Sequence, residues 1–391
     1  IIVRGKVMYF TVNDISQLND ILNRIGAKVQ LNKSRRDRAE SSYRYICNWI
    51  QDDPEYFGNY DLEFYSQGSY KIGTTVKPLS GDEFDLDFVL QIKSDWYNEN
   101  PISILNNLEK RLKCHDVYKP KVERKTRCIR INYENEFHID ILPGIPENKN
   151  LLDTKLKVPD REKKGWTDGN PKGFASWFES KANNYNRILL EKRYASIEPL
   201  PDEIPYELID PLKRIVQLMK RYRDIYYVDK VEDAPRSIII TTLAAINYDG
   251  ELSEYDGILN ILYKIKKQII SYGNKPIEIY NPTNEKEKLS EKWDDDIVSY
   301  KEFCNFIDEF ILEWNNLKQL ETFEEKAQAL KILFGESITN EALKEQADYI
   351  SKLRSNNFIA IDTNNGMIKS NRGLSLGESL KGVRKNTFYG E

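Results

Sequence analysis

The fold is decided by the stretch FDLDFVL, residues 84–90. Successive residues of a β-strand point to opposite faces, so Leu86 and Phe88 are expected in a core, and Asp85 and Asp87 on the other face. Two carboxylates would then project side by side. Taken alone, the pattern also fits an edge strand whose two aspartates only face water.

A second stretch, FHIDIL at residues 137–142, repeats the alternation and puts Asp140 on a polar face. If the two strands are neighbours, Asp85, Asp87 and Asp140 converge. Such a cluster repels itself unless a cation compensates it, and hard carboxylate oxygens suit Mg2+ or Mn2+. Two such ions about 3.5 to 4 Å apart can drive a phosphoryl displacement, which is the chemistry of nucleotide addition. We therefore predict that these three aspartates are both metal ligands and catalytic residues.

The motif Gln67-Gly68-Ser69 follows a strand predicted at residues 62–65. A glycine there lets the backbone approach a phosphate, while the serine hydroxyl and the adjacent amides donate hydrogen bonds to it. A Gly-Ser pair alone is a weak signal. Its combination with the two aspartate strands is far more specific for a nucleotide site.

The composition is that of an ordinary globular protein, with 391 residues, 40% of them hydrophobic and 31% charged. No run of about 18 apolar residues occurs, and residues 1–10 are too short and mixed for a secretory signal, so we expect a cytoplasmic protein without membrane contact. The scattered cysteines and two histidines leave little room for a zinc module or a disulfide framework. The net charge of -4 argues against a protein that grips a nucleic-acid duplex along its length.

The periodicity of the apolar residues predicts three regions. Residues 1–200 mix strands and helices and include a long amphipathic helix over residues 34–50, whereas residues 201–356 are mainly helical. Residues 357–391 are polar and glycine-bearing, and we expect them to form a loosely held tail. Further strands are predicted at residues 84–92, 128–133 and 137–142, and further helices at residues 102–113, 208–224, 237–247, 257–272, 297–317 and 323–334.

The combination of Gly68-Ser69 with the aspartate strands resembles the DNA polymerase beta-like nucleotidyltransferases. The chain resembles the bacterial cGAS/DncV-like nucleotidyltransferases more closely, from about residue 34 to residue 334. Four longer motifs carry this resemblance: QGSYKIGTTVKP (67–78), DEFDLD (82–87), RCIR (127–130) and HIDILP (138–143). The resemblance implies an α+β fold, with a mixed sheet and a long N-terminal helix in the catalytic lobe and a mainly helical second lobe. It also implies that Asp85 and Asp87 bind both metal ions and that Asp140 helps to deprotonate the acceptor hydroxyl.

The same resemblance assigns the residues that hold the donor triphosphate. Lys220 and Ser237 match a lysine on the helix after the catalytic lobe and a serine that opens the next helix, and Gln67 lies beside the phosphate loop formed by Gly68 and Ser69. Helical periodicity leaves Lys220 on a polar face, where a plain surface lysine is the alternative. Ser237 could equally be the N-cap of the helix it begins, and the two roles are compatible because a helix N-terminus attracts anions.

The function implied by the resemblance is a synthase of anti-phage (CBASS) defence that joins ribonucleoside triphosphates, ATP among them, into a cyclic di- or trinucleotide second messenger. The alternative is an enzyme that adds nucleotides to an RNA end or another acceptor, since it would keep the same aspartates. A catalytically dead binding module is disfavoured, because a scaffold has no reason to retain clustered like charges. The sequence lacks the zinc-bearing insert of animal cyclic GMP-AMP synthase, so we expect no duplex DNA activator.

Two further features stay open at this point. Arg161 and Lys172 could touch phosphate, although salt bridges on the rim of the site are favoured. The C-terminal tail ends in NTFYGE, residues 386–391, in which Phe388 and Tyr389 could dock on an accessory protein or pack back on the helical lobe as a latch.

Overall fold

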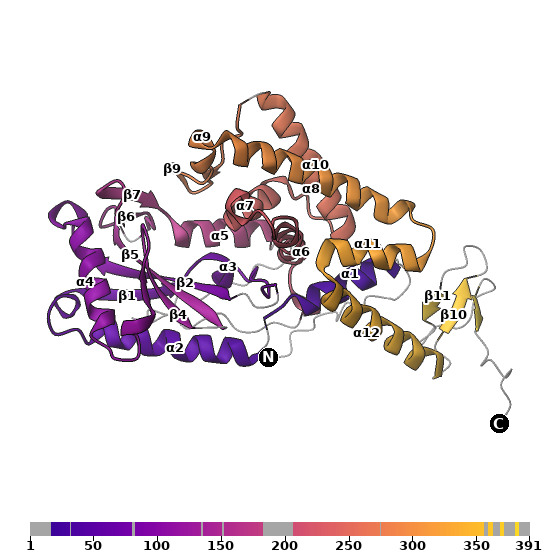
Figure 1. Ribbon diagram of the computed structural model, residues 1–391, viewed down its shortest axis with the longest axis horizontal. Coiled ribbons are helices and arrows are strands. Elements are labelled where there is room, and N and C mark those ends of the chain that lie inside the picture. The colour runs from indigo at the N-terminus through magenta and orange to yellow at the C-terminus, as the bar shows by residue number, and fades with distance from the viewer. Residues whose placement is uncertain are drawn as a thin grey trace. The chain divides into compact units, whose positions relative to one another are not determined.

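A computed structural model of the protein (Figure 1) describes residues 17–31, 33–79, 83–133, 136–150, 152–182, 206–273, 275–355, 359–362, 368–370 and 380–382. The chain divides into two compact units, of which the larger comprises residues 29–319 and the smaller residues 1–28 together with 320–391. All the residues that the sequence nominates for chemistry lie in the larger unit.

A mixed sheet, seven-stranded over the described residues, organises the larger unit. The strand order is β1-β2-β5-β4-β3, with β6 paired to β5 and β7 paired to β6. Strands β2 and β5 are parallel, whereas β2 pairs with β1, and β5 with β4, in antiparallel fashion. The two strands that bear the aspartates are therefore neighbours. The bounds are β1 (Asp61–Ser66), β2 (Phe84–Lys93), β3 (Val122–Arg124), β4 (Ile129–Tyr133), β5 (Phe137–Pro146), β6 (Leu156–Asp160) and β7 (Gly165–Gly169).

One face of this sheet is covered by α2 (Lys33–Gln51) and α4 (Pro101–Lys113) (Figure 1). The apolar residues of α2 recur at helical spacing and are buried, and the ring of Tyr43 lies edge-on to Phe88 with centroids 5.0 Å apart. Helix α4 begins where Asn100 caps the amides of its first turn. Because Leu86, Phe88 and the alternate isoleucines of β4 and β5 fill this core, the polar residues between them are left on the opposite face.

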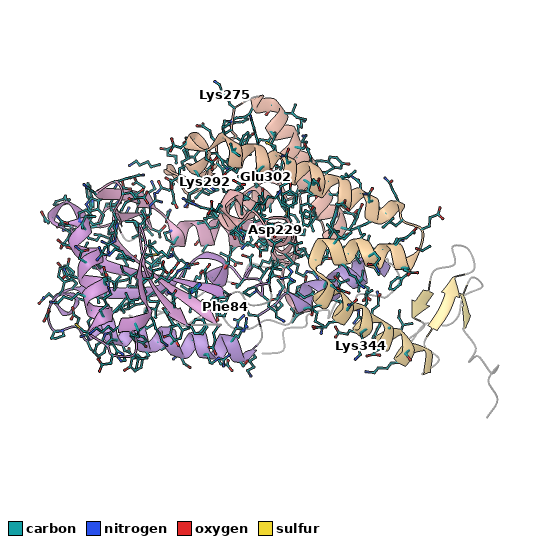
Figure 2. All side chains as sticks on the ribbon, in the orientation of Figure 1. Phe84, Asp229, Lys275, Lys292, Glu302 and Lys344 are labelled. Carbon is teal, nitrogen blue, oxygen red and sulfur yellow. The ribbon has the colours of Figure 1, made fainter. Side chains whose placement is uncertain are left out.

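The remainder of the larger unit is mainly helical, as predicted. Along α10 a row of buried aromatic residues packs against α6 and α8: the ring centroids of Tyr222 and Phe310 are 4.3 Å apart, and Tyr255 stacks on Trp314. Figure 2 labels Glu302 of α10, which accepts a hydrogen bond of 3.0 Å from the Tyr226 hydroxyl of α6. The bounds are α3 (Gly68–Lys71), α5 (Pro171–Ala182), α6 (Pro211–Tyr226), α7 (Ser237–Asn247), α8 (Glu254–Tyr272), β8 (Tyr280–Asn281), β9 (Asn284–Lys288), α9 (Lys292–Asp295) and α10 (Ile297–Gln319).

In the smaller unit, α1 (Gln17–Lys28) packs against α12 (Glu336–Ser355). Lys28 pairs with Glu345 at 3.2 Å, and the Gln346 amide donates to Asp20 at 2.8 Å. Helix α11 (Phe323–Phe334) starts with a reciprocal capping box between Thr322 and Glu325.

The prediction of a loosely held tail is corrected at three places in the smaller unit. Three short strands pair there in the order β11-β10-β12, all antiparallel. Their bounds are β10 (Ile359–Asp362), β11 (Ile368–Ser370) and β12 (Leu380–Gly382). Strands of three or four residues in a polar sequence carry too few alternations to be recognised locally. Residues 386–391, with Phe388 and Tyr389, lie outside the described residues.

No helix in the described ranges combines the length and the apolar content that crossing a membrane requires.

Candidate active site

The site is built on a row of three residues across neighbouring strands. Asp87 of β2 is the direct partner of Asp140 in the parallel pair, and Asp140 is in turn the partner of Arg130 in the antiparallel pair with β4. Direct partners project from the same face of a sheet. Asp85 lies two residues before Asp87 and shares that face, so the fold brings the three predicted aspartates together and adds an arginine.

Arg130 ties two of the carboxylates together. Its Nε donates to Oδ1 of Asp140 at 2.7 Å, its Nη2 donates to Oδ2 of the same residue at 2.7 Å, and Nη2 also lies 3.1 Å from Oδ1 of Asp85. The two-point contact with Asp140 raises the pKa of the Arg130 guanidinium above its ordinary value, so this group stays charged. A cation therefore already sits among the aspartates.

The third carboxylate, that of Asp87, is strongly disfavoured in its charged form. Removal from water, followed by repulsion from Asp85 and Asp140, raises the pKa of Asp87 to about 8, against the opposing charges of Arg130 and Lys220. Removal from water and the charge of Asp140 also raise the pKa of Asp85, although Arg130 opposes the shift. The cluster is thus unfavourable as an array of three anions, as the sequence predicts.

Within the described residues, no group of three or more histidine, cysteine, aspartate or glutamate side chains is arranged as a ready metal site. The guanidinium of Arg130 forms ion pairs with Asp140 and Asp85. The donors themselves are hard carboxylate oxygens on one face, of the kind that Mg2+ and Mn2+ prefer. Their chemistry therefore fits a divalent cation, while their present orientation serves the guanidinium.

The predicted phosphate loop, formed by Gly68 and Ser69, lies directly against Asp87. The amide of Gln67 donates to the Asp87 carbonyl at 2.9 Å, and Gly68 follows with a positive φ of 61°. A Cβ atom on Gly68 would lie 2.6 Å from Oδ2 of Asp87, so a side chain at this position would force the Asp87 carboxylate to move. The hydroxyl of Thr75 donates to the Ser69 hydroxyl at 3.2 Å and closes the loop on itself.

Helix α6 supplies a polar face that is buried against residues 73–75, which follow this loop. Lys220 is only 3% exposed, and its Nζ donates to the carbonyl of Thr74 at 3.2 Å and to the Thr74 hydroxyl at 3.0 Å. Gln217 donates to the carbonyls of Gly73 and Thr75, at 3.2 Å each. Removal from water, reinforced by the nearby charge of Arg223, lowers the pKa of Lys220 to about 7. The surface-lysine alternative does not hold.

Ser237 is the first residue of α7, and the N-cap position belongs to Arg236. The interpretation of Ser237 as a plain N-cap is therefore wrong. Its hydroxyl instead accepts a hydrogen bond of 2.5 Å from Nη1 of Arg223, which lies one turn after Lys220 on α6. The two helices pack against each other (Figure 1), which brings Lys220, Arg223 and Ser237 into one neighbourhood.

The two cations assigned to the rim form salt bridges, as favoured. Arg161 donates to Asn106 at 2.9 Å and lies 3.7 Å from Glu109, while Lys172 pairs with Glu63 at 2.6 Å.

The sequence reasoning missed Arg130 and Arg223 as individual residues. Arg130 could have been found from its position between Ile129 and Ile131, which places it on the polar face of its strand. Arg223 could have been found from its spacing of three residues from Lys220, which places both on one side of a helix.

The amino-acid sequence of the chain is similar to those of known proteins. Residues 16–183 match the Second Messenger Oligonucleotide or Dinucleotide Synthetase domain. The c-di-GMP synthase of Roseivirga ehrenbergii is 37% identical over 388 residues, which are 98% of this chain and 100% of that protein. The cyclic dinucleotide synthase CdnG of Bradyrhizobium diazoefficiens is 26% identical over 243 residues, 57% of each chain.

Solved structures agree on the fold. The structure of the Bradyrhizobium diazoefficiens CdnG in complex with GTP matches with a TM-score of 0.69 and 20% identity, over 85% of this chain and 100% of that one. The apo form of DncV from Vibrio cholerae matches with a TM-score of 0.55 and 15% identity, over 82% and 80% of the two chains. These similarities confirm the predicted α+β fold with a mixed sheet and a helical C-terminal region.

Proposed function

The chain belongs to the cGAS/DncV-like nucleotidyltransferases, and we propose that it joins two molecules of GTP into a cyclic dinucleotide, cyclic di-GMP. Membership of the family makes the protein a nucleotidyltransferase. The choice of product is supported by the relative that is similar over nearly the whole chain and is itself a c-di-GMP synthase. The observation that carries the proposal is the contact of Gly68 with Asp87, because it joins a phosphate loop to the row of carboxylates.

The reaction forms two phosphodiester bonds and releases two pyrophosphates. In each step a ribose hydroxyl of one nucleotide attacks the α-phosphorus of another, the hydroxyl proton passes to a base, and the bond to the pyrophosphate breaks. By its family resemblance Asp140 is the residue that helps to take this proton. The linear dinucleotide then turns round in the same site, and its free hydroxyl attacks its own triphosphate end.

The donor triphosphate is held, in this proposal, by groups from three elements. The loop supplies the backbone at Gly68 and the Ser69 hydroxyl beside Gln67, α6 supplies Lys220 and α7 supplies Ser237. Lys220 is suited to the role because its buried ammonium is poorly compensated in the free protein, where a lowered pKa marks the cost of its charge. An anionic triphosphate would restore that charge.

Two magnesium ions, with manganese as a substitute, belong to the same proposal. Asp85, Asp87 and Asp140 would hold them, and the guanidinium of Arg130 already shows that two of these carboxylates accept a cation as partner. When bound, such ions neutralise the developing phosphoryl charge and activate the attacking hydroxyl. The residues of the protein orient the triphosphate and take up the proton.

We further propose that the product acts as a cytoplasmic second messenger of anti-phage defence. This role is supported by the resemblance to synthases of such systems.

One incubation tests the product. The purified protein is supplied with GTP, with ATP, with CTP, with UTP and with all four together, each with Mg2+, and the products are analysed by mass spectrometry. We expect a ring-closed product containing two guanosine monophosphate units, and none from a variant with Asp87→Asn. Only linear products, or extension of an added RNA, would instead favour the alternative nucleotidyltransferase.

A further inference from the structure

We propose that Arg223 is a positioning residue of the triphosphate site: it fixes the Ser237 hydroxyl so that its proton is directed at a phosphate. This inference rests on the proposed function and adds one residue to it. Arg223 lies on α6 one turn beyond Lys220, and its partner Ser237 opens α7.

The hydrogen bonds of Arg223 fix its guanidinium from two sides. Nη1 donates to the Ser237 hydroxyl at 2.5 Å and to the carbonyl of Pro235 at 3.2 Å. On the other side Nε and Nη2 donate to Oδ1 of Asp224 at 2.9 and 2.5 Å. The side chain is 19% exposed, so it is largely enclosed by these partners. A guanidinium anchored in this way is a fixed donor and not a mobile surface group.

The consequence for Ser237 follows from the capacity of a hydroxyl. A serine side chain has one O–H donor and two acceptor positions, and its hydrogen rotates to suit its neighbours. Because the Ser237 oxygen accepts from a permanent cation, its own hydrogen must turn away from Arg223. Ser237 can then donate this hydrogen to another acceptor, which is the role that binding a phosphate oxygen requires.

The charges of Lys220 and Arg223 also favour an anionic ligand beside Ser237. Arg223 is close enough to Lys220 to disfavour its protonated form, and two cations brought together in a protein interior favour an anion beside them. Asp224 pairs with Arg223, and the charges of Asp224 and Asp87 offset only part of the shift, so the pKa of Lys220 stays lowered. A triphosphate is therefore the ligand class that satisfies the ammonium of Lys220 and the hydroxyl of Ser237 together.

The test is a double-mutant cycle read by ligand binding. Dissociation constants for GTP and for GMP are measured without Mg2+ for the wild type, Arg223→Ala, Ser237→Ala and the double variant, with melting temperatures for all four. We expect each single change to weaken GTP binding by about tenfold, and the double change to weaken it no further, because Arg223 acts through Ser237. Binding of GMP should be unchanged, since it lacks the outer phosphates.

Three companion variants make the result specific. Arg223→Lys keeps the charge and should restore part of the GTP affinity, whereas Asp224→Asn tests whether loss of the ion pair alone matters and should cost less than Arg223→Ala. Lys266→Ala also removes one positive charge, from α8, where Lys266 forms an ion pair with Asp308 of α10, and should match the wild type. If Arg223→Ala lowers the melting temperature strongly, Arg223→Met, which keeps a long side chain but has no N–H donor, replaces it in the cycle.

The possible failures are distinguishable. Additive losses in the double variant would make Arg223 a direct phosphate ligand and overturn the positioning role. Equal losses for GTP and GMP would reduce Arg223 to a structural residue. If Lys220→Ala loses GTP affinity while Arg223→Ala does not, this inference alone is wrong. If Lys220→Ala and Ser237→Ala are both without effect, the proposed triphosphate site itself is wrong.

Discussion

Asp87 and Asp140 are direct partners in the parallel pairing of β2 and β5. Side chains at such positions lie within a few ångströms of each other, so two carboxylates are forced together by backbone hydrogen bonds alone. The raised pKa of Asp87 is the electrostatic consequence.

Removing the charge of Asp87 should abolish synthesis and should not destabilise the fold. Burial and repulsion raise its pKa to about 8. Above that pH the Asp87 carboxylate is charged in the folded protein, where its charge costs more free energy than in the unfolded chain. The folded pKa is raised, and therefore the native state loses stability as the pH rises from about 4 to about 8. Asp87→Asn should raise the free energy of unfolding most above pH 8, measured by urea titration without metal. Asp61→Asn, at an exposed ion pair of the same sheet, is the control and should keep full product yield.

Gly68→Ala should be far more damaging than its control, Gly273→Ala. Both glycines have a positive φ, of 61° and 64°, which side chains of L-residues rarely adopt, so both substitutions are strained. Only at Gly68 would the added methyl meet Asp87, whereas nothing lies within 4 Å at Gly273. We expect a loss of product formation by more than about tenfold for Gly68→Ala alone. Equal activity in the two variants would show that the loop does not need its close approach to Asp87.

Lys220→Ala should reduce kcat/KM for the nucleoside triphosphate at least about tenfold, the loss of one charge-assisted contact of about 1.5 to 3 kcal/mol. Lys213→Ala is the matched control on the same helix, because Lys213 is occupied by Glu179 at 2.7 Å. Its effect should be smaller. Indistinguishable steady-state kinetics for the two variants would mean that α6 does not contact the triphosphate.

The stability of the protein should depend on pH through Lys220. Burial lowers its pKa to about 7, so below that pH the folded protein bears the full cost of a buried cation, and between pH 7 and the ordinary value of 10.5 the unfolded chain binds more protons. Stability therefore rises with pH across this window, by at most about 1.4 kcal/mol per pH unit. Urea unfolding of the wild type and of Lys220→Met should diverge in this range, with the wild type gaining relative to the variant as the pH rises. Parallel curves would contradict a buried, partly neutral Lys220.

Arg130→Ala should make the protein more dependent on divalent cations. The substitution leaves Asp140 and Asp85 without their cation, so the melting temperature in chelator should fall, and Mg2+ or Mn2+ should raise it by more than in the wild type. Arg124→Ala, which removes an exposed arginine that pairs with the buried Glu109, is the control and should respond to the cations as the wild type does. An equal cation-induced shift in Arg130→Ala and in the wild type would argue against a metal at these carboxylates.

Alternation within β2 and β5 was enough to place the three aspartates on polar faces, because the side-chain period of a strand is a local property. Helical spacing likewise predicted α7 and α11 with the bounds that the structure has, and α2 to within one residue at each end. The short strands β10, β11 and β12 were not foreseen, since segments of three or four residues carry almost no periodic signal.

Tertiary structure alone decided which residues meet. The register that sets Asp87 beside Asp140, and Asp140 beside Arg130, depends on hydrogen bonds between strands that are distant in sequence, and no local pattern encodes it. The packing of α6 on the phosphate loop and on α7 turned Lys220 from a surface lysine into a buried one, and gave Ser237 the guanidinium of Arg223 as its partner. The sequence by itself therefore determined the chemical groups and the faces they occupy. Their pairing, burial and charge state were decided by contacts between distant segments, because these depend on the environment that the whole fold creates.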